Sequence, residues 1–313
     1  MTEQRTFLVT GAAGCIGAWV IAKLLRRGDR AVAFDISDNR RRLRLLLDGP
    51  AADRVPWIIG DLTDTGAVDR ALVESDATAI IHLAALQIPF CKADPVAGAK
   101  VNVVGQVNIF EAARKHRINH LVYASSIAAL PPEGEDLPAT LYGVYKAADE
   151  GIAHVYAKDW SVPSIGLRPH TVYGLGRDQG LTSAPTKAML AAVAGQPFTI
   201  PFAGPLNLQH AGEVADIFIR GAEAEVAPDH TAVHDLQGTT MDVGTIADLI
   251  RQQVPRARIT VSGPSLPFPA SFDDAPLRRT IGAWPSVKPE AGIADTISAF
   301  DRLLRQGLIA FAD

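Results

Sequence analysis

Short apolar segments alternate with longer amphipathic segments over the first half of the chain. The apolar segments, such as AIIHLA at residues 79–84, show little alternation of polar and apolar residues. Strands of a parallel sheet have this pattern because helices cover both faces of the sheet. The alternation therefore predicts an α/β fold, built from βαβ units around a doubly wound parallel sheet.

After about residue 172 this regularity declines, because glycine and proline become frequent through residues 174–205. A smaller, irregular C-terminal part is expected there. The strands are predicted at residues 6–10, 31–35, 55–60, 79–84, 120–125, 164–169 and 232–236. The helices are predicted at residues 16–27, 66–74, 96–116, 142–158, 213–224, 243–254 and 291–306.

The composition is that of a soluble globular enzyme: 48% of the 313 residues are hydrophobic, 20% are charged and the net charge is −4. No basic block stands out, so no nucleic-acid partner is expected. The uncharged stretch at residues 6–22 contains three glycines, which favours a strand–turn–helix over a membrane segment. Two cysteines and scattered histidines give neither a disulfide framework nor a metal site, so we expect a cytoplasmic protein without a metal.

A glycine-rich turn joins the first strand to the first helix, with Gly11, Gly14 and Gly17 spaced three residues apart. In a dinucleotide site the first glycine permits a tight turn, the second lets backbone amides approach a pyrophosphate, and the third lets the helix pack on the strand. The helix N-terminus then faces the anion with its free amides. Turn and packing glycines without a ligand are the alternative interpretation.

Asp35 ends the second strand, 18 residues after Gly17. A carboxylate there accepts hydrogen bonds from the ribose hydroxyls of NAD and repels the 2′-phosphate of NADP. Asp61 follows the third strand, where it is placed to meet the adenine edge. The arginines at residues 40–42 favour NADP, although a solvated helix start explains them more simply. We therefore expect a Rossmann-type domain that binds NAD.

Tyr142 and Lys146 are four residues apart at the start of a predicted helix and therefore share a face. A phenol, with a pKa near 10 in solution, becomes a usable base only when cations stabilise its phenolate. Tyr145 is the competing tyrosine, but Asp149 lies four residues after it and disfavours its phenolate. Ser125 and Ser126 end the fifth strand, at the sheet edge where ligands bind. A turn cap is the alternative role for these serines.

Taken in order, these motifs resemble the extended short-chain dehydrogenase/reductase family, of the NAD-dependent epimerase/dehydratase type. The resemblance covers nearly the whole chain. It implies that Ser126, Tyr142 and Lys146 are catalytic, with Lys146 holding the nicotinamide ribose. It also implies a homodimer formed through the helices at 96–116 and 142–158. The motifs are TGxxGxxG at residues 10–17, HLAA at 82–85, Asn102, YASS at 123–126, YxxxK at 142–146 and LRPxxVYG at 167–174.

The contacts expected from the glycine loop, the acids and the resemblance divide into two sets, and His82 is expected to be structural. The cofactor set is Gly11, Gly14, Cys15, Ile16, Gly17, Asp35, Asp61, Leu62, Leu83, Ala84, Ala85, Asn102, Tyr142, Lys146 and Pro169. The substrate set is Gln87, Ser126, His170, Thr171 and Arg177. Residues 1–172 are predicted to form the cofactor domain, joined again by the segment near 207–238, and residues 173–313 to be mainly substrate-binding.

Two departures from the family concern the substrate. Nucleotide-sugar members carry a cation before the segment at residues 204–214, but no arginine or lysine lies between Lys187 and Arg220. A diphosphate bound without a nearby cation would be poorly compensated. The loop between Ser126 and Tyr142 is also short and lacks the usual Tyr-Gly. Both departures suggest a smaller substrate, for which Arg177 is a candidate anchor, although a salt bridge to its neighbours is equally open.

Three functions remain in view. The first is an NAD-dependent oxidoreductase that moves hydride between nicotinamide and a secondary alcohol carbon of a small, sugar-like or polyhydroxylated substrate. The second is a sugar or nucleotide-sugar epimerase or dehydratase, in which the hydride returns to the substrate and NAD stays bound. The third is a non-catalytic dinucleotide-binding protein, which the presence of both Tyr142 and Lys146 disfavours.

Overall fold

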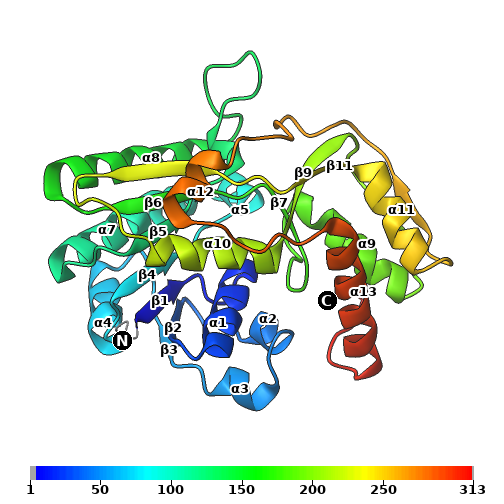
Figure 1. Ribbon diagram of the computed structural model, residues 1–313, viewed down its shortest axis with the longest axis horizontal. Helices are drawn as coiled ribbons and strands as arrows, with labels where there is room; N and C mark the ends of the chain where they lie inside the picture. The colour runs from blue at the N-terminus through cyan, green and yellow to red at the C-terminus, as the bar shows by residue number, and fades with distance from the viewer. Residues whose placement is uncertain (1–4, 312–313) are drawn as a thin grey trace.

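A computed structural model describes residues 5–311, in which a seven-stranded parallel sheet lies beside a smaller part with short strands and helices (Figure 1). The strand order of the large sheet is β10-β6-β5-β4-β1-β2-β3. The order reverses between β1 and β4, which creates a crevice at the carboxyl edge where ligands of such sheets bind. The strands are β1 (Thr6–Thr10), β2 (Arg30–Asp35), β3 (Trp57–Ile59), β4 (Ala79–His82), β5 (Leu121–Ala124), β6 (Ser164–Arg168) and β10 (Thr231–Asp235).

Helices cover both faces of this sheet, which is why the middle of its central strands is apolar on both faces. Phe7 and Val9 of β1 pack in one cluster with α1 (Cys15–Arg27) and α10 (Ala211–Glu223), whereas Leu8 points into the opposite cluster. That second cluster includes α4 (Thr65–Ser75), α7 (Gly105–His116) and α8 (Leu141–Trp160). The α/β fold with a doubly wound parallel sheet is confirmed.

The smaller part has a separate core between α9, α11 and α13. Its strands form a three-stranded sheet, β11-β9-β7, and a two-stranded sheet, β12-β8. Its elements are β7 (Thr171–Tyr173), η3 (Leu181–Ser183), α9 (Ala184–Val193), β8 (Phe198–Ile200), β9 (Pro205–His210), β11 (Thr239–Asp242), α11 (Val243–Gln253), β12 (Ile259–Val261) and α13 (Pro289–Arg305). The connecting elements are α2 (Arg41–Arg44), α3 (Gly49–Asp53), α5 (Ile88–Ala93), α6 (Pro95–Ala99), η1 (Lys100–Val104), η2 (Ile127–Ala129) and α12 (Ala275–Ile281).

The structure differs from the sequence prediction in several places. The smaller part contains elements that were not predicted: β7, β8, β9, β11, β12 and α9. The helix predicted at residues 96–116 contains a π-helical turn, η1, between α6 and α7. In the segment at 207–238, β9 belongs to the small sheet, whereas β10 pairs with β6 in the large one. The division into two functional domains stays a prediction. No helix within residues 5–311 is both long and apolar enough to cross a membrane.

Candidate active site

The glycine loop between β1 and α1 is so crowded that side chains cannot replace Gly11 or Gly17. Gly11 has a φ of +66°, and a Cβ there would lie 2.6 Å from the backbone nitrogen of Ala84. A Cβ on Gly17 would lie 2.3 Å from the carbonyl oxygen of Gly11. Helix α1 begins directly after Gly14, and Gly14 lines a large cavity. The free amides at the start of α1 are therefore available to an anion in this cavity. The loop fits a pyrophosphate.

Asp35 lies at the end of β2 and lines the same cavity. Its carboxylate accepts hydrogen bonds from the backbone amides of Ala13, at 2.9 Å, and Ile36, at 2.8 Å. Burial raises the pKa of Asp35, while these amides act in the opposite direction. The acid is thereby fixed beside the glycine loop, as a ribose acceptor must be.

Arg42 is not the solvated residue that the sequence suggested. Its side chain donates to the carbonyl oxygens of Ala13, at 2.7 Å, and Gly176, at 3.0 Å, and pairs with Asp178 at 2.6 Å. Arg41 pairs with the same carboxylate. Asp178 comes from a distant loop that no local pattern connects to the arginines. This carboxylate engages the cations that would otherwise attract a 2′-phosphate.

The opposite end of the cavity holds Ser126 and Tyr142. Thr140 caps α8 by accepting a hydrogen bond from the Gly143 amide at 3.0 Å. A Cβ on Gly143 would lie only 2.1 Å from the Ala128 carbonyl oxygen, so the start of α8 packs directly on the turn that follows Ser126. This close packing brings the serine and the tyrosine to one site.

Lys146 is buried, and its side-chain nitrogen donates to the Ala124 carbonyl at 2.7 Å and to Asp149 at 3.0 Å. Burial acts to lower the pKa of Lys146, but the charges of Asp149 and Tyr142 outweigh burial and raise it. Burial raises the pKa of Asp149 to about 6, against the effect of Lys146. The lysine is therefore held as an ammonium group next to the end of β5.

The two serines after β5 have different surroundings. The hydroxyl of Ser125 donates to Glu150, whose carboxylate also binds Arg168 at 2.7 Å. The hydroxyl of Ser126 accepts from the Ala128 amide at 3.2 Å and has no carboxylate partner among residues 5–311. The sequence did not reveal the Glu150–Arg168 pair, which holds α8 to β6. The geometry favours Ser126 as the serine that meets a ligand.

Asn102 is not among the residues that line the cavity, and its contact with the cofactor stays a prediction. It is buried in the π-helical turn, where its side chain accepts from the Leu86 amide at 2.7 Å and donates to the Leu86 carbonyl at 2.9 Å. It thus fixes the segment after β4 that lines the cavity.

His82 is buried in β4, and its Nδ1 is hydrogen-bonded to the Thr10 hydroxyl at 2.7 Å. Burial lowers the pKa of His82 to about 3, which is consistent with a structural role.

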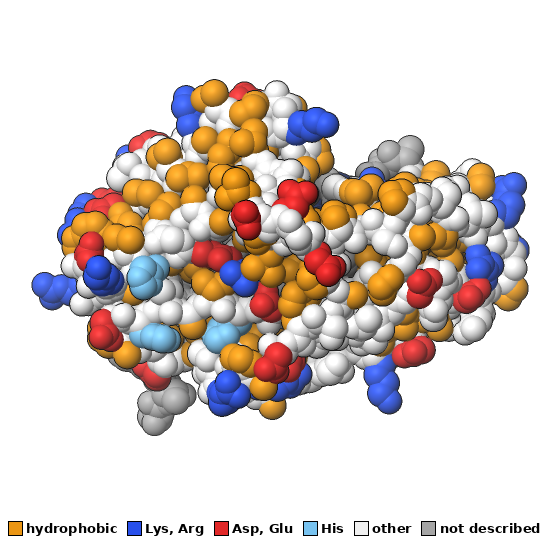
Figure 2. All heavy atoms as spheres, turned by 90° about the horizontal axis from the view of Figure 1, so that it is seen from above, with side chains coloured by type: hydrophobic (Ala, Val, Ile, Leu, Met, Phe, Trp, Pro, Cys, Tyr) orange, Lys and Arg blue, Asp and Glu red, His pale blue; other side chains and the backbone are white. Residues whose placement is uncertain are grey.

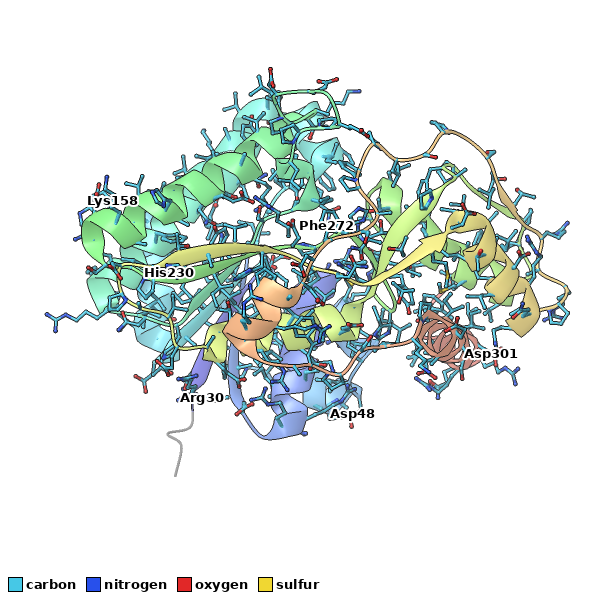
Figure 3. The ribbon with its side chains drawn as sticks, turned by 45° about the horizontal axis from the view of Figure 1, so that its top comes forward. Arg30, Asp48, Lys158, His230, Phe272 and Asp301 are labelled. Atoms are coloured by element: carbon cyan, nitrogen blue, oxygen red, sulfur yellow. The ribbon has the colours of Figure 1, made fainter. Side chains whose placement is uncertain are left out.

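His170 lines the substrate end, but both of its ring nitrogens are engaged. Nδ1 lies 3.0 Å from the Thr171 hydroxyl and Nε2 lies 2.9 Å from the Pro269 carbonyl. Burial lowers the pKa of His170 to about 4. The ring contacts Phe268 and Phe272, the latter labelled in Figure 3 on the segment that leads to α12. His170 therefore holds the segment that contributes Phe268 to the cavity, and no sequence motif predicted that contribution.

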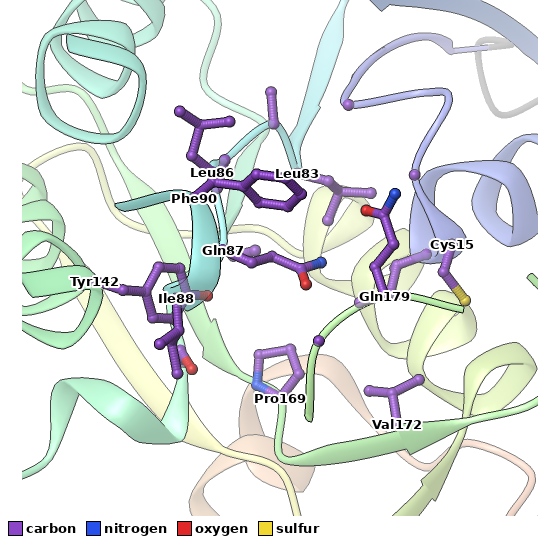
Figure 4. Close-up of a pocket in the computed structure, with 18 of the residues that line it drawn as sticks. Cys15, Leu83, Leu86, Gln87, Ile88, Phe90, Tyr142, Pro169, Val172 and Gln179 are labelled. Carbon is purple, nitrogen blue, oxygen red and sulfur yellow. The ribbon is translucent and has the colours of Figure 1, made fainter. Parts of the chain in front are cut away.

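Arg177 lines the cavity close enough to Cys15, at the start of α1, to act on its charge. Its guanidinium donates to the Thr182 hydroxyl at 2.9 Å, and its Nε is buried without a hydrogen-bond partner in the described chain. The cavity has a volume of about 810 Å³. Figure 4 shows Tyr142 on one side of it, Cys15 and Gln179 on the other, and Gln87 between them. The predicted site residues other than Asn102 all line this cavity.

Known proteins resemble this chain in sequence and in fold. The model of the NAD dependent epimerase/dehydratase family matches residues 7–232. An uncharacterized 37.6 kDa protein of Escherichia coli O111:H- is 34% identical, over 59% of each chain. A probable UDP-glucuronate 4-epimerase of Rhizobium meliloti is 27% identical over 96% of this chain and 98% of its own. The structure of a Thermus thermophilus UDP-glucose 4-epimerase with NAD has a TM-score of 0.77 and 25% identity, and the match covers 94% of this chain and 98% of that one.

Proposed function

The chain belongs to the NAD dependent epimerase/dehydratase family, and on this basis we propose that it oxidises or reduces a secondary alcohol carbon of a small, sugar-like substrate. It is an NAD-dependent enzyme of the extended short-chain dehydrogenase/reductase type. The family alone does not decide its reaction, because its name covers both epimerases and dehydratases. The proposal therefore depends on the residues at the two ends of the cavity.

Ser126, Tyr142 and Lys146 are proposed to carry the proton chemistry. NAD, when bound, supplies a hydride acceptor or donor. The hydroxyl of Ser126 donates a hydrogen bond to the substrate oxygen, and the phenolate of Tyr142 removes the proton from that oxygen. The ammonium group of Lys146 stabilises this phenolate by charge. In the reverse direction the phenol of Tyr142 returns the proton.

The small substrate is supported by one observation, the scarcity of free cations. Among the described residues, three cationic side chains line the cavity, and two of them pair with carboxylates: Arg42 with Asp178 and Lys146 with Asp149. Arg177 has no carboxylate partner in the described part of the chain. One arginine compensates a single carboxylate well, but a second diphosphate beside that of NAD would be poorly compensated. We therefore propose that Gln87, Thr171 and Arg177 contact a small substrate, with His170 supporting them.

Epimerisation is the second candidate, since UDP-glucuronate 4-epimerases are among the relatives. The same residues would remove a hydroxyl proton and later return it, while hydride leaves and re-enters the substrate on opposite faces. NAD would then stay bound and no NADH would accumulate. Tight retention of NAD during purification would favour this candidate.

A panel of sugars, sugar acids and polyols separates these functions when NADH release and isomerised product are scored separately. The proposal expects NADH release from a small member of the panel. Isomerised product without a net absorbance change would instead support the epimerase. Bound NAD without turnover on any member, nucleotide sugars included, would support a non-catalytic dinucleotide-binding protein.

A homodimer is also proposed, through the helical segment at residues 96–116, which spans α6, η1 and α7, and through α8. Figure 2 shows hydrophobic side chains among charged ones on the face seen from above in Figure 1. A sedimentation experiment with the purified protein tests this, and a monomer at all concentrations would refute it. The exposed apolar side chains on α6, η1 and α8 include Val96, Val104, Leu141, Val144 and Val155.

A further inference from the structure

Lys146 and Asp149 form a buried ion pair on α8, close to Tyr142. The side chain of Lys146 is 3% exposed and that of Asp149 is 0% exposed, with 3.0 Å between Nζ and Oδ2. The free-energy cost of removing two charges from water is often larger than the free energy gained from their attraction. Packing alone therefore does not explain an aspartate at this position on α8, where an apolar residue would fill the space at lower cost.

Lys146 and Asp149 do not use all of their hydrogen-bonding capacity within the described residues. An ammonium group has three N–H donors. Lys146 gives one to the Ala124 carbonyl and one to Asp149, which leaves one for the cavity that Lys146 lines. The second carboxylate oxygen of Asp149 is buried and has no hydrogen-bond partner among the described residues. Within residues 5–311, the side-chain hydrogen bond of Asp149 is therefore with the lysine alone.

Asp149 is also the carboxylate that compensates the charge of Lys146. Burial raises the pKa of the Cys91 thiol and lowers the pKa of His82 to about 3, so both are neutral near pH 7. Glu150, the next residue on α8, is engaged by Arg168. The groups that face the pair from its own and neighbouring elements are Tyr142, Glu150, Cys91, His82 and Tyr123.

We propose that Asp149 is a positioning residue, which fixes Lys146 as an ammonium group with one N–H directed toward the ribose of NAD. The proposal rests on the role given to Lys146 under the proposed function. Without the carboxylate, burial would favour the neutral amine, and the side chain could rotate away from the Ala124 carbonyl. The lysine would then bind the ribose less well and support the Tyr142 phenolate over a narrower pH range.

Asp149→Asn tests this, because it keeps the shape and removes the charge. We expect its NAD affinity at pH 8 to fall about tenfold, the contribution of one hydrogen bond to a charged group. We also expect the loss of affinity at alkaline pH to begin about one pH unit lower than in the wild type. Asp159→Asn removes a charge from the exposed end of the same helix and should bind NAD as the wild type does.

Calorimetric titration with NAD at pH 7 to 10 measures the NAD affinity of each variant. This measurement needs no turnover, so it remains interpretable even if the protein does not catalyse the proposed reaction. A folded Asp149→Asn protein with the wild-type affinity across this range would overturn the proposal. If the variant does not fold, lysine-selective ¹⁵N NMR of the wild-type protein decides. A protected Lys146 ammonium signal, assigned by its loss in Lys146→Met, should persist at pH 9, and a neutral amine there would overturn the proposal.

Discussion

The two ends of the cavity are built in different ways. The cofactor end consists mainly of backbone from one continuous stretch, Gly11 to Gly17, with Asp35 hydrogen-bonded to it. The substrate end combines side chains from segments far apart in sequence, such as Gln87, Arg177 and Phe268. A local backbone site can be recognised from glycine spacing alone. A site assembled from distant side chains depends on tertiary contacts that short motifs do not record.

Tyr142 is proposed to act where the cofactor end and the substrate end of the cavity meet. Replacing it by phenylalanine should cause the largest loss of activity among these tests. Loss of the phenol should lower kcat by about a hundredfold to ten-thousandfold, as removal of a general base does, while NAD affinity changes little. Tyr145→Phe is the matched control, because its hydroxyl only donates to the Pro95 carbonyl at 3.0 Å. Equal turnover of Tyr142→Phe and wild type on the substrate found by the panel would remove Tyr142 from the mechanism.

Gly17→Ala tests how much of the cofactor end depends on close packing. A Cβ there would clash with backbone and force α1 away from β1, which we expect to cost about 1–3 kcal/mol of unfolding free energy and to weaken NAD binding. In Gly151→Ala the added Cβ has open space on α8, so it should stabilise by about 0.5–1 kcal/mol. Urea unfolding and NAD titration measure both variants. Unchanged NAD affinity in Gly17→Ala would contradict the account of the loop.

Asp178→Asn tests whether the distant loop contributes to cofactor choice. Freeing Arg41 and Arg42 should raise the affinity for NADP relative to NAD by about tenfold, since a charged hydrogen bond to the 2′-phosphate becomes available. Asp53→Asn frees Arg44 at the exposed end of the same run and should leave the ratio unchanged. If the affinity for NADP relative to NAD is the same in Asp178→Asn as in Asp53→Asn, then Arg42 does not reach the ribose.

A titration of stability tests the substrate end, with the smallest expected effect. Burial lowers the pKa of His170 to about 4, below the value near 6.5 expected in the unfolded chain. The unfolded state therefore binds more protons between these values, and stability falls as the pH decreases from about 6.5 to 4, by at most about 1.4 kcal/mol per pH unit. Urea unfolding of His170→Gln should show a shallower decrease than wild type or the exposed control His154→Gln. Identical slopes in all three would contradict the burial of His170.

The sequence was sufficient for the elements whose cause is local. Strands such as residues 6–10 were predicted because both of their faces are apolar, and the glycine loop because only glycine fits there. Arg42 was misjudged because Asp178, its partner, lies in a distant loop. The buried contacts of Asn102 with Leu86 depend on the π-helical turn, which no local pattern in the sequence predicted. Phe268 left no signal, because an apolar residue in a proline-rich segment has no characteristic spacing.

The claim that the substrate end accepts a small ligand is tested most directly by titrating UDP into the NAD-loaded protein. UDP carries the nucleoside diphosphate of a nucleotide sugar, and its binding needs no knowledge of the sugar. Within residues 5–311, Arg177 is the one arginine lining the cavity that has no carboxylate partner, so the account predicts a Kd weaker than about 1 mM, or less than roughly 4 kcal/mol of binding free energy. Micromolar binding of UDP that is lost in Arg177→Met would contradict it and assign the cavity to a nucleotide sugar.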